Sequence, residues 1–396
     1  MSFVPDRGEL LPLTYHTKVV DYLRRHEPEV WRWAAERTVR AEQLESLRAE
    51  LLRDTYRIDA QVHGDVHAAL TTAMSRLGIE GGATLYQSPG QDMNASLVFV
   101  PGEIHMVLQG PLLERLSSDE LLAVFGHELA HHLLWSRDEG QFLVADRILH
   151  DTVAAHGPCE SHRETYRRYS LHTELFADRG GAIAAGAVEP AVSTLVKVVT
   201  GMGVVDAAAY LRQAEEIESA EKSASAAYSH PETFIRARAV ALWWAGHADL
   251  ETWLRKRLIG PLVLDQLDLL DQARLQALSR GFLAHYLADV DCVSETVMTQ
   301  VRGMFPDWQN DEIPAGPETF ASDVMDDSVH RYFNALMMDL ALADPDLRDA
   351  GLLRAGRIAT QLGSFEALQT NLRRDAGFGK RELERYTRQL TDEVRA

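Results

Sequence analysis

The segment of residues 117–135 constrains the fold of this chain more than any other part of the sequence. Ser117 and Glu120 match the capping box that begins many helices. Apolar side chains then recur at helical spacing to the end of the segment, so we expect one helix with a buried face. His127 and His131 lie four residues apart, which places both imidazoles on the same face of that helix.

The five residues from His127 to His131 form an HExxH pattern, His-Glu-Leu-Ala-His. Two imidazoles one turn apart can bind one zinc ion, and catalytic zinc keeps a position open for water. Glu128 lies about 100° around the helix from His127, so its carboxylate can reach that water rather than the metal. The pattern predicts a Zn²⁺ site with Glu128 as catalytic base. The alternative is a helix with surface histidines, which the capped and apolar setting disfavours.

A third ligand is predicted at Glu174, which follows His131 by 43 residues in a second helical segment. It would complete the His₂Glu set of a catalytic zinc site. Asp178 lies four residues after Glu174 on the same face, where it can accept the second ring N–H of a ligand histidine. For Glu174 alone, a solvated helix carboxylate is the other interpretation. We expect Gly180-Gly181 to end this helix.

Three stretches occur in a fixed order around these residues. They are NASLVFVPGEIHMVLQGPLLERLSSDELLAVFGHELAHHLL, then ELFADRGGA, then SHPETFIRAR. Together they resemble the peptidase family of HtpX and the CAAX prenyl proteases over roughly residues 60–245. The resemblance implies a zinc metallopeptidase that acts on a protein or peptide substrate, with the ligands and base already named.

The resemblance also implies two residues that spacing alone does not single out. They are His230 of the Ser-His-Pro segment and Arg236, six residues later. Both are placed near the developing oxyanion, where an N–H donor or a cation stabilises charge that appears in the transition state. One strand of the hairpin that we expect over residues 96–108, turning at Pro101-Gly102, is predicted to pair with an extended peptide.

Composition excludes several other classes of protein. The formal net charge of −19 argues against binding of nucleic acid, which needs a basic face. The chain has only two cysteines and no apolar run long enough for a transmembrane segment, and its first residues lack a signal-peptide pattern. We therefore expect a soluble, cytoplasmic protein. Unlike it, the best-known members of the resembling family are integral membrane proteins.

The expected fold is mainly α, with an α+β zincin-like catalytic domain that contains a small β-sheet. We predict an N-terminal helical segment over residues 1–60, the metallopeptidase domain over 61–249 and a helical C-terminal domain over 250–396. A Pro- and Gly-rich stretch divides the last into halves, 250–302 and 325–396. The second half loosely resembles TerB-like helical domains.

Two other functions remain open. The metal domain could be a non-catalytic scaffold whose C-terminal helices bind a partner in a signalling or stress assembly, although a scaffold needs no base at Glu128. The chain could also be a latent enzyme, with the C-terminal domain or an N-terminal segment covering the cleft.

Overall fold

The computed structural model describes residues 9–36, 41–100, 102–155, 160–221, 223–309, 312–320 and 325–395. The chain divides into two compact units, residues 1–260 and 261–396. The fold is mainly α with one small sheet, which confirms the expected fold class. The domain boundaries drawn from the sequence stay predictions. Among the described helices, none is both long enough and apolar enough to cross a bilayer.

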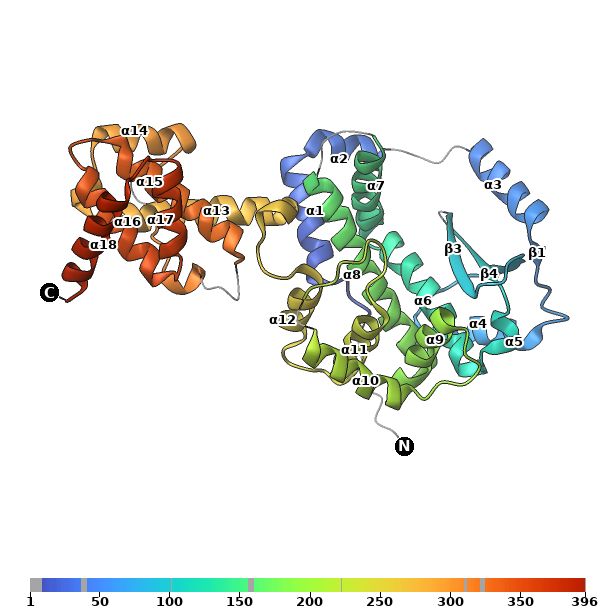
Figure 1. Ribbon diagram of the computed structural model, residues 1–396. Coiled ribbons are helices and arrows are strands. Elements are labelled where there is room, and N and C mark those ends of the chain that lie inside the picture. The colour runs from blue at the N-terminus through green and yellow to red at the C-terminus, as the bar shows by residue number, and fades with distance from the viewer. Residues whose placement is uncertain are drawn as a thin grey trace. The chain divides into compact units, whose positions relative to one another are not determined.

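The first unit is built largely from helices (Figure 1). Its helices are α1 (Thr14–His26), α2 (Pro28–Ala35), α3 (Ala41–Asp54), α4 (Gly64–Arg76), α5 (Leu112–Arg115), α6 (Ser118–Ser136), α7 (Gln141–Ala154), α8 (Glu160–Ala185), α9 (Val188–Thr200), α10 (Ala207–Ala220), α11 (Thr233–Trp244) and α12 (Leu250–Leu254). Helix α6 begins where the sequence predicts: the Ser117 hydroxyl accepts from the Glu120 amide, and the Glu120 carboxylate accepts from the Ser117 amide. This capping box satisfies two amide groups that the first turn would otherwise leave unpaired.

The sheet has four described strands, β1 (Tyr56–Arg57), β2 (Ala83–Ser88), β3 (Asn94–Val100) and β4 (Glu103–Gln109). Their order is β1-β2-β4-β3, with β2 and β4 parallel and the other pairs antiparallel. The predicted hairpin is therefore confirmed as β3 and β4. Gly102 has the positive φ of 79° that its turn requires, while Pro101 lies outside the described residues. Strand β4 is interior, and β3 is the outer strand of the described sheet.

Helices α6 and α8 cross with their backbones almost in contact. A Cβ added at Gly180 would lie 2.4 Å from the Ala130 Cβ and 2.7 Å from the Gly126 carbonyl oxygen. The prediction that Gly180-Gly181 ends a helix is wrong, because α8 continues through both residues to Ala185. These glycines serve the close crossing instead of a helix end, and the crossing brings the middle turns of the two helices together.

Apolar side chains fill the space on either side of α6. One core lies between α4, the sheet and α6, and includes Leu70, Met106 and Phe125. Another joins α6 and α8 to α9, α10 and α11, through residues such as Val192 and Val240. Helices α1 and α7 pack against α8 as well. With core on both sides, the middle turns of α6 and α8 are held in place at their crossing.

The second unit is a set of helices with its own core. The described helices are α13 (Leu269–Leu287), α14 (Glu295–Met304), α15 (Asp327–Ala343), α16 (Arg348–Gln361), α17 (Phe365–Arg374) and α18 (Lys380–Arg395). Phe282 stacks on Phe333 with ring centroids 4.4 Å apart at the centre of this core. In the acidic turn after α15, Asp344 accepts hydrogen bonds from the Ser294 hydroxyl and the Asp346 amide. The TerB-like resemblance stays a prediction.

Candidate metal centre

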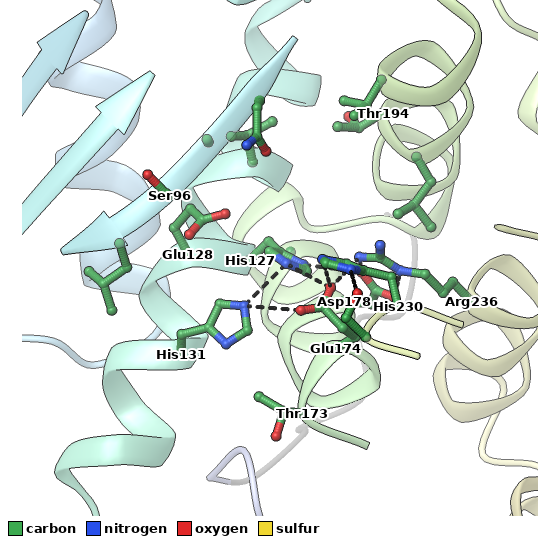
Figure 2. A pocket seen from close by; sticks show the side chains of 18 of the residues that line it. Ser96, His127, Glu128, His131, Thr173, Glu174, Asp178, Thr194, His230 and Arg236 are labelled. Atoms are coloured by element: carbon green, nitrogen blue, oxygen red, sulfur yellow. Dashed lines mark hydrogen bonds and ion pairs between the residues drawn. The ribbon is translucent and has the colours of Figure 1, made fainter. Parts of the chain in front are cut away.

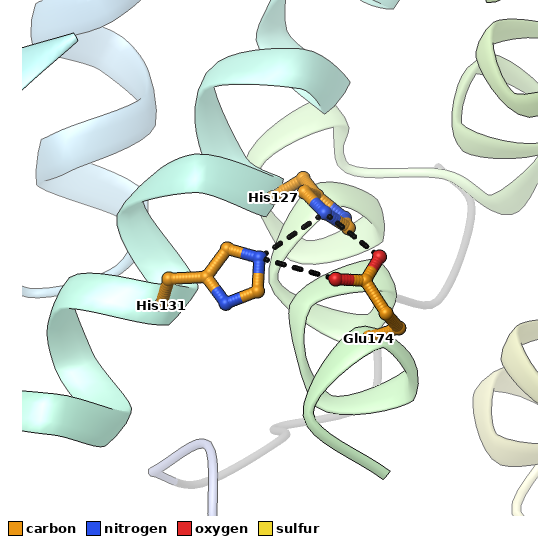
Figure 3. A group of neighbouring side chains, drawn as sticks. All are labelled: His127, His131 and Glu174. Atoms are coloured by element: carbon orange, nitrogen blue, oxygen red, sulfur yellow. Dashed lines mark hydrogen bonds and ion pairs between the residues drawn. The ribbon is translucent and has the colours of Figure 1, made fainter. Parts of the chain in front are cut away.

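The structure brings His127, His131 and Glu174 together at the α6–α8 crossing (Figure 3), where all three line one cavity. The two Nε2 atoms lie 3.3 Å apart. The Glu174 carboxylate oxygens lie 3.6 Å from the Nε2 of His127 and 3.7 Å from the Nε2 of His131. Among the described residues, this is the cluster of histidine, cysteine or acidic side chains whose donor atoms could hold one metal ion.

The donor set and its spacing fit zinc. Tetrahedral zinc with bonds of about 2.1 Å requires ligand atoms about 3.4 Å apart, close to the three observed separations. The Glu174 Oε2 atom is buried and accepts no hydrogen bond from the described residues, although cationic groups lie near it. A buried carboxylate oxygen without a hydrogen bond is costly unless a cation occupies the space that it faces.

His127 is held by a contact from α8. Its Nδ1–H donates to Asp178 Oδ1 at 3.1 Å, which leaves the Nε2 lone pair directed towards His131 and Glu174. Burial by itself would lower the pKa of His127, but this hydrogen bond and the nearby carboxylates raise it above the usual value. The carboxylate therefore fixes the tautomer and the orientation of this imidazole.

His131 is held differently. Its ring stacks on Trp135, one turn later in α6, with centroids 5.4 Å apart. Burial and the charge of the neighbouring His127 together lower the pKa of His131 to about 4. The imidazole is therefore neutral at physiological pH, as a metal ligand must be.

Asp178 and Arg236 form a buried ion pair beside the cluster. The Arg236 Nε and Nη2 atoms donate to the two Asp178 oxygens at 2.8 and 2.7 Å, and Nη2 lies 3.2 Å from Glu174 Oε2. Burial opposes the charge on Asp178, but Arg236 and His127 hold its pKa well below the usual range. Burial likewise opposes the charge on Glu174, whose pKa these same cations lower. Both carboxylates are therefore ionised.

Glu128 is buried on the side of the cluster that faces β3 (Figure 2). Burial raises its pKa to about 7, and the charge of His127 and a hydrogen bond from the Leu97 backbone act in the opposite direction. Because that amide belongs to the outer strand β3, the strand edge and the carboxylate lie next to each other. A carboxylate with a pKa near 7 can both accept and release a proton at neutral pH.

The remaining predicted site residue, His230, lies in the segment between α10 and α11. Its Nε2 is 3.6 Å from Glu174 Oε2, and 61% of its side chain is exposed. The structure thus brings all seven predicted side chains into one place. Sequence reasoning missed the backbone of Leu97, which no side-chain pattern could reveal, and Asp146, which lines the same cavity from α7.

Comparisons with known proteins agree with this geometry. The model of peptidase family M48 matches residues 60–243. The plastoglobule-localized metallopeptidase 48, chloroplastic, of Arabidopsis thaliana is 30% identical over 198 residues, which cover 45% of this chain and 56% of that protein. The chain thus matches little more than half the length of this relative. No solved structure matches the chain. The fold, the site and the family match together support one class of protein, a metallopeptidase.

Proposed function

We propose that this chain is a zinc-dependent endopeptidase that hydrolyses peptide bonds of protein substrates. One observation carries the proposal. Three donor atoms suited to zinc converge at the α6–α8 crossing, with a buried carboxylate of suitable pKa on the adjacent residue of the same helix. The match of residues 60–243 to a peptidase family supports it.

In this proposal Glu128 is the general base and acid. Zinc, when bound by His127, His131 and Glu174, supplies a Lewis acid and a water of lowered pKa. Glu128 accepts a proton from the attacking water and then delivers it to the nitrogen of the leaving amine. The raised pKa of Glu128 favours both transfers near neutral pH.

The peptide is aligned by the outer edge of β3. Asn94, Ala95, Ser96 and Leu97 line the cavity that holds the metal ligands. An extended peptide can pair with a free strand edge through backbone hydrogen bonds, which tolerate varied side chains. The peptide strand is therefore proposed to pair with β3 and not with Ile104–Leu108, which lies inside the sheet.

His230 and Arg236 are proposed to differ in role. The Nε and Nη2 groups of Arg236 donate to Asp178, and Nη2 also lies near Glu174, so the proposed contribution of Arg236 is to hold these carboxylates in place. The exposed His230 ring lies at the mouth of the cluster, where it is available to donate to the developing oxyanion. His230→Ala is then expected to lower kcat without loss of bound zinc.

The test compares zinc content and casein cleavage in the wild type and in Glu128→Gln. We expect the variant to retain about one zinc per chain and to lose nearly all activity, because the amide cannot accept the proton. Glu216→Gln, which changes an exposed carboxylate of α10, is the matched control and should behave as wild type. Equal cleavage by wild type and Glu128→Gln would contradict the proposal, and zinc binding without any cleavage would favour the scaffold.

The other expectations from the sequence remain proposals. They are a cytoplasmic location, the absence of nucleic-acid binding, and a protein partner or autoinhibition through the C-terminal helices.

A further inference from the structure

The cavity at the metal centre has two chemically different ends. Its volume is about 720 Å³. Helix α9 contributes Leu195, Val198 and Val199 to its lining, and α8 contributes Tyr166 and Ser170. In Figure 2 the labelled Thr194 of α9 and Thr173 of α8 lie on opposite sides of the three ligands. A bound peptide would therefore meet an apolar wall on one side of the ligands and a polar wall on the other.

Asp146 of α7 belongs to the polar end. It lines the cavity, and its charge adds to the effect of burial in raising the pKa of both Tyr166 and Tyr169, so the carboxylate lies near these α8 side chains. In the part of the chain that the structure describes, no donor or cation forms a hydrogen bond or ion pair with this carboxylate. Burial also raises the pKa of Asp146, and the nearby charges do not offset this effect.

The groups that act on Asp146 come from two helices. On α7, Arg147 and His150 favour its ionised form, and Asp151 opposes it. From α8, the neutral Tyr166 faces it. The loss of hydration on burial has a larger effect on the pKa of Asp146 than any of these groups. A carboxylate kept at a cavity wall without a partner is costly to the folded state, and such groups concentrate at binding sites.

We propose that Asp146 determines specificity by binding a lysine or arginine side chain of the peptide substrate. The inference rests on the proposed peptidase function. Tyr166 precedes the ligand Glu174 by eight residues of one helix, or about 12 Å, which equals three to four residues of extended peptide. The basic residue therefore lies within about four positions of the scissile bond. It lies on one side only, because the opposite end of the cavity is apolar.

The test uses a synthetic peptide library randomised at four positions on either side of a central bond, with cleavage sites read by mass spectrometry. We expect wild-type enzyme to select lysine or arginine at one position. Peptide pairs with lysine or the uncharged norleucine at that position should then differ roughly ten- to a hundredfold in kcat/KM. Asp146→Asn should reduce this ratio to near one, and Asp146→Glu, which keeps the charge, should preserve part of it.

The ratio compares two peptides on one enzyme, so partial unfolding of a variant does not change it. Asp21→Asn, an exposed residue of α1, alters the net charge equally and should leave the ratio at the wild-type value. Cleavage with no basic preference, or a preference that Asp146→Asn retains, overturns this inference and leaves the peptidase intact. A zinc-loaded wild type that cleaves no peptide overturns both.

Discussion

The buried pair of Asp178 and Arg236 allows a quantitative test of how the metal centre is supported. Only 3% of the Asp178 side chain and 13% of the Arg236 side chain are exposed, and two hydrogen bonds join them. Removing one member of such a pair leaves an uncompensated buried charge and costs about 3–5 kcal/mol. In Asp178→Asn, Glu174 still lies 3.2 Å from Arg236 and compensates part of its charge. We therefore expect this variant to lose about 3 kcal/mol of stability, the lower end of that range.

The double variant Asp178→Asn/Arg236→Met should lose less stability than the two single variants added together. Both charges are then gone, so neither is left buried alone, and the shortfall should be about 1–3 kcal/mol. The measurement is urea unfolding of metal-free protein followed by tryptophan fluorescence. Every tryptophan except Trp308 lies before residue 260, so the signal reports mainly on the first unit. Glu160→Gln, which removes an exposed ion pair, is the control and should cost under about 1 kcal/mol.

Asp178→Asn should also weaken zinc binding about 10- to 100-fold, as measured by chelator competition, because His127 loses the partner that fixes its tautomer. Additive stability losses, or a zinc affinity within twofold of wild type, would refute this account of the site.

Two further predictions concern the surroundings of the centre. Gly180→Ala should destabilise the first unit by about 1–3 kcal/mol and weaken zinc binding, because the added Cβ would lie 2.4 Å from the Ala130 Cβ of α6. Thermal unfolding and zinc titration measure the two effects, and Gly203→Ala at an exposed position is the control. Asp146→Asn should stabilise the protein at pH 7.5. Burial raises the pKa of Asp146 to about 6, above the unfolded value near 4, so its ionisation removes stability as the pH rises between those values. The gain should be about 1–3 kcal/mol at pH 7.5 and vanish near pH 4; a gain that is equal at both would refute the assignment.

The sequence alone determined what depends on residues close together in the chain. The capping box at Ser117 and the helical spacing after it predict where α6 lies, and two histidines four residues apart must share a face of a helix. The alternating strands and the Gly102 turn likewise predict the hairpin, because turn geometry is a local property. With these in place, the sequence predicted Glu174 as third ligand and Asp178 as support, and the structure has both side chains beside the two histidines.

Only the tertiary structure decided which distant groups meet. Gly180 and Gly181 suit both a helix end and a close crossing, and the packing of α6 selects the crossing. That β3 and not β4 is the outer strand follows from the placement of β2, which no residue of the hairpin encodes. The packing of α11 on α8 brings Arg236 to Asp178, and the packing of α7 on α8 brings Asp146 to the cavity. Such contacts join residues tens of positions apart, and packing of whole elements selects them where local backbone preference cannot.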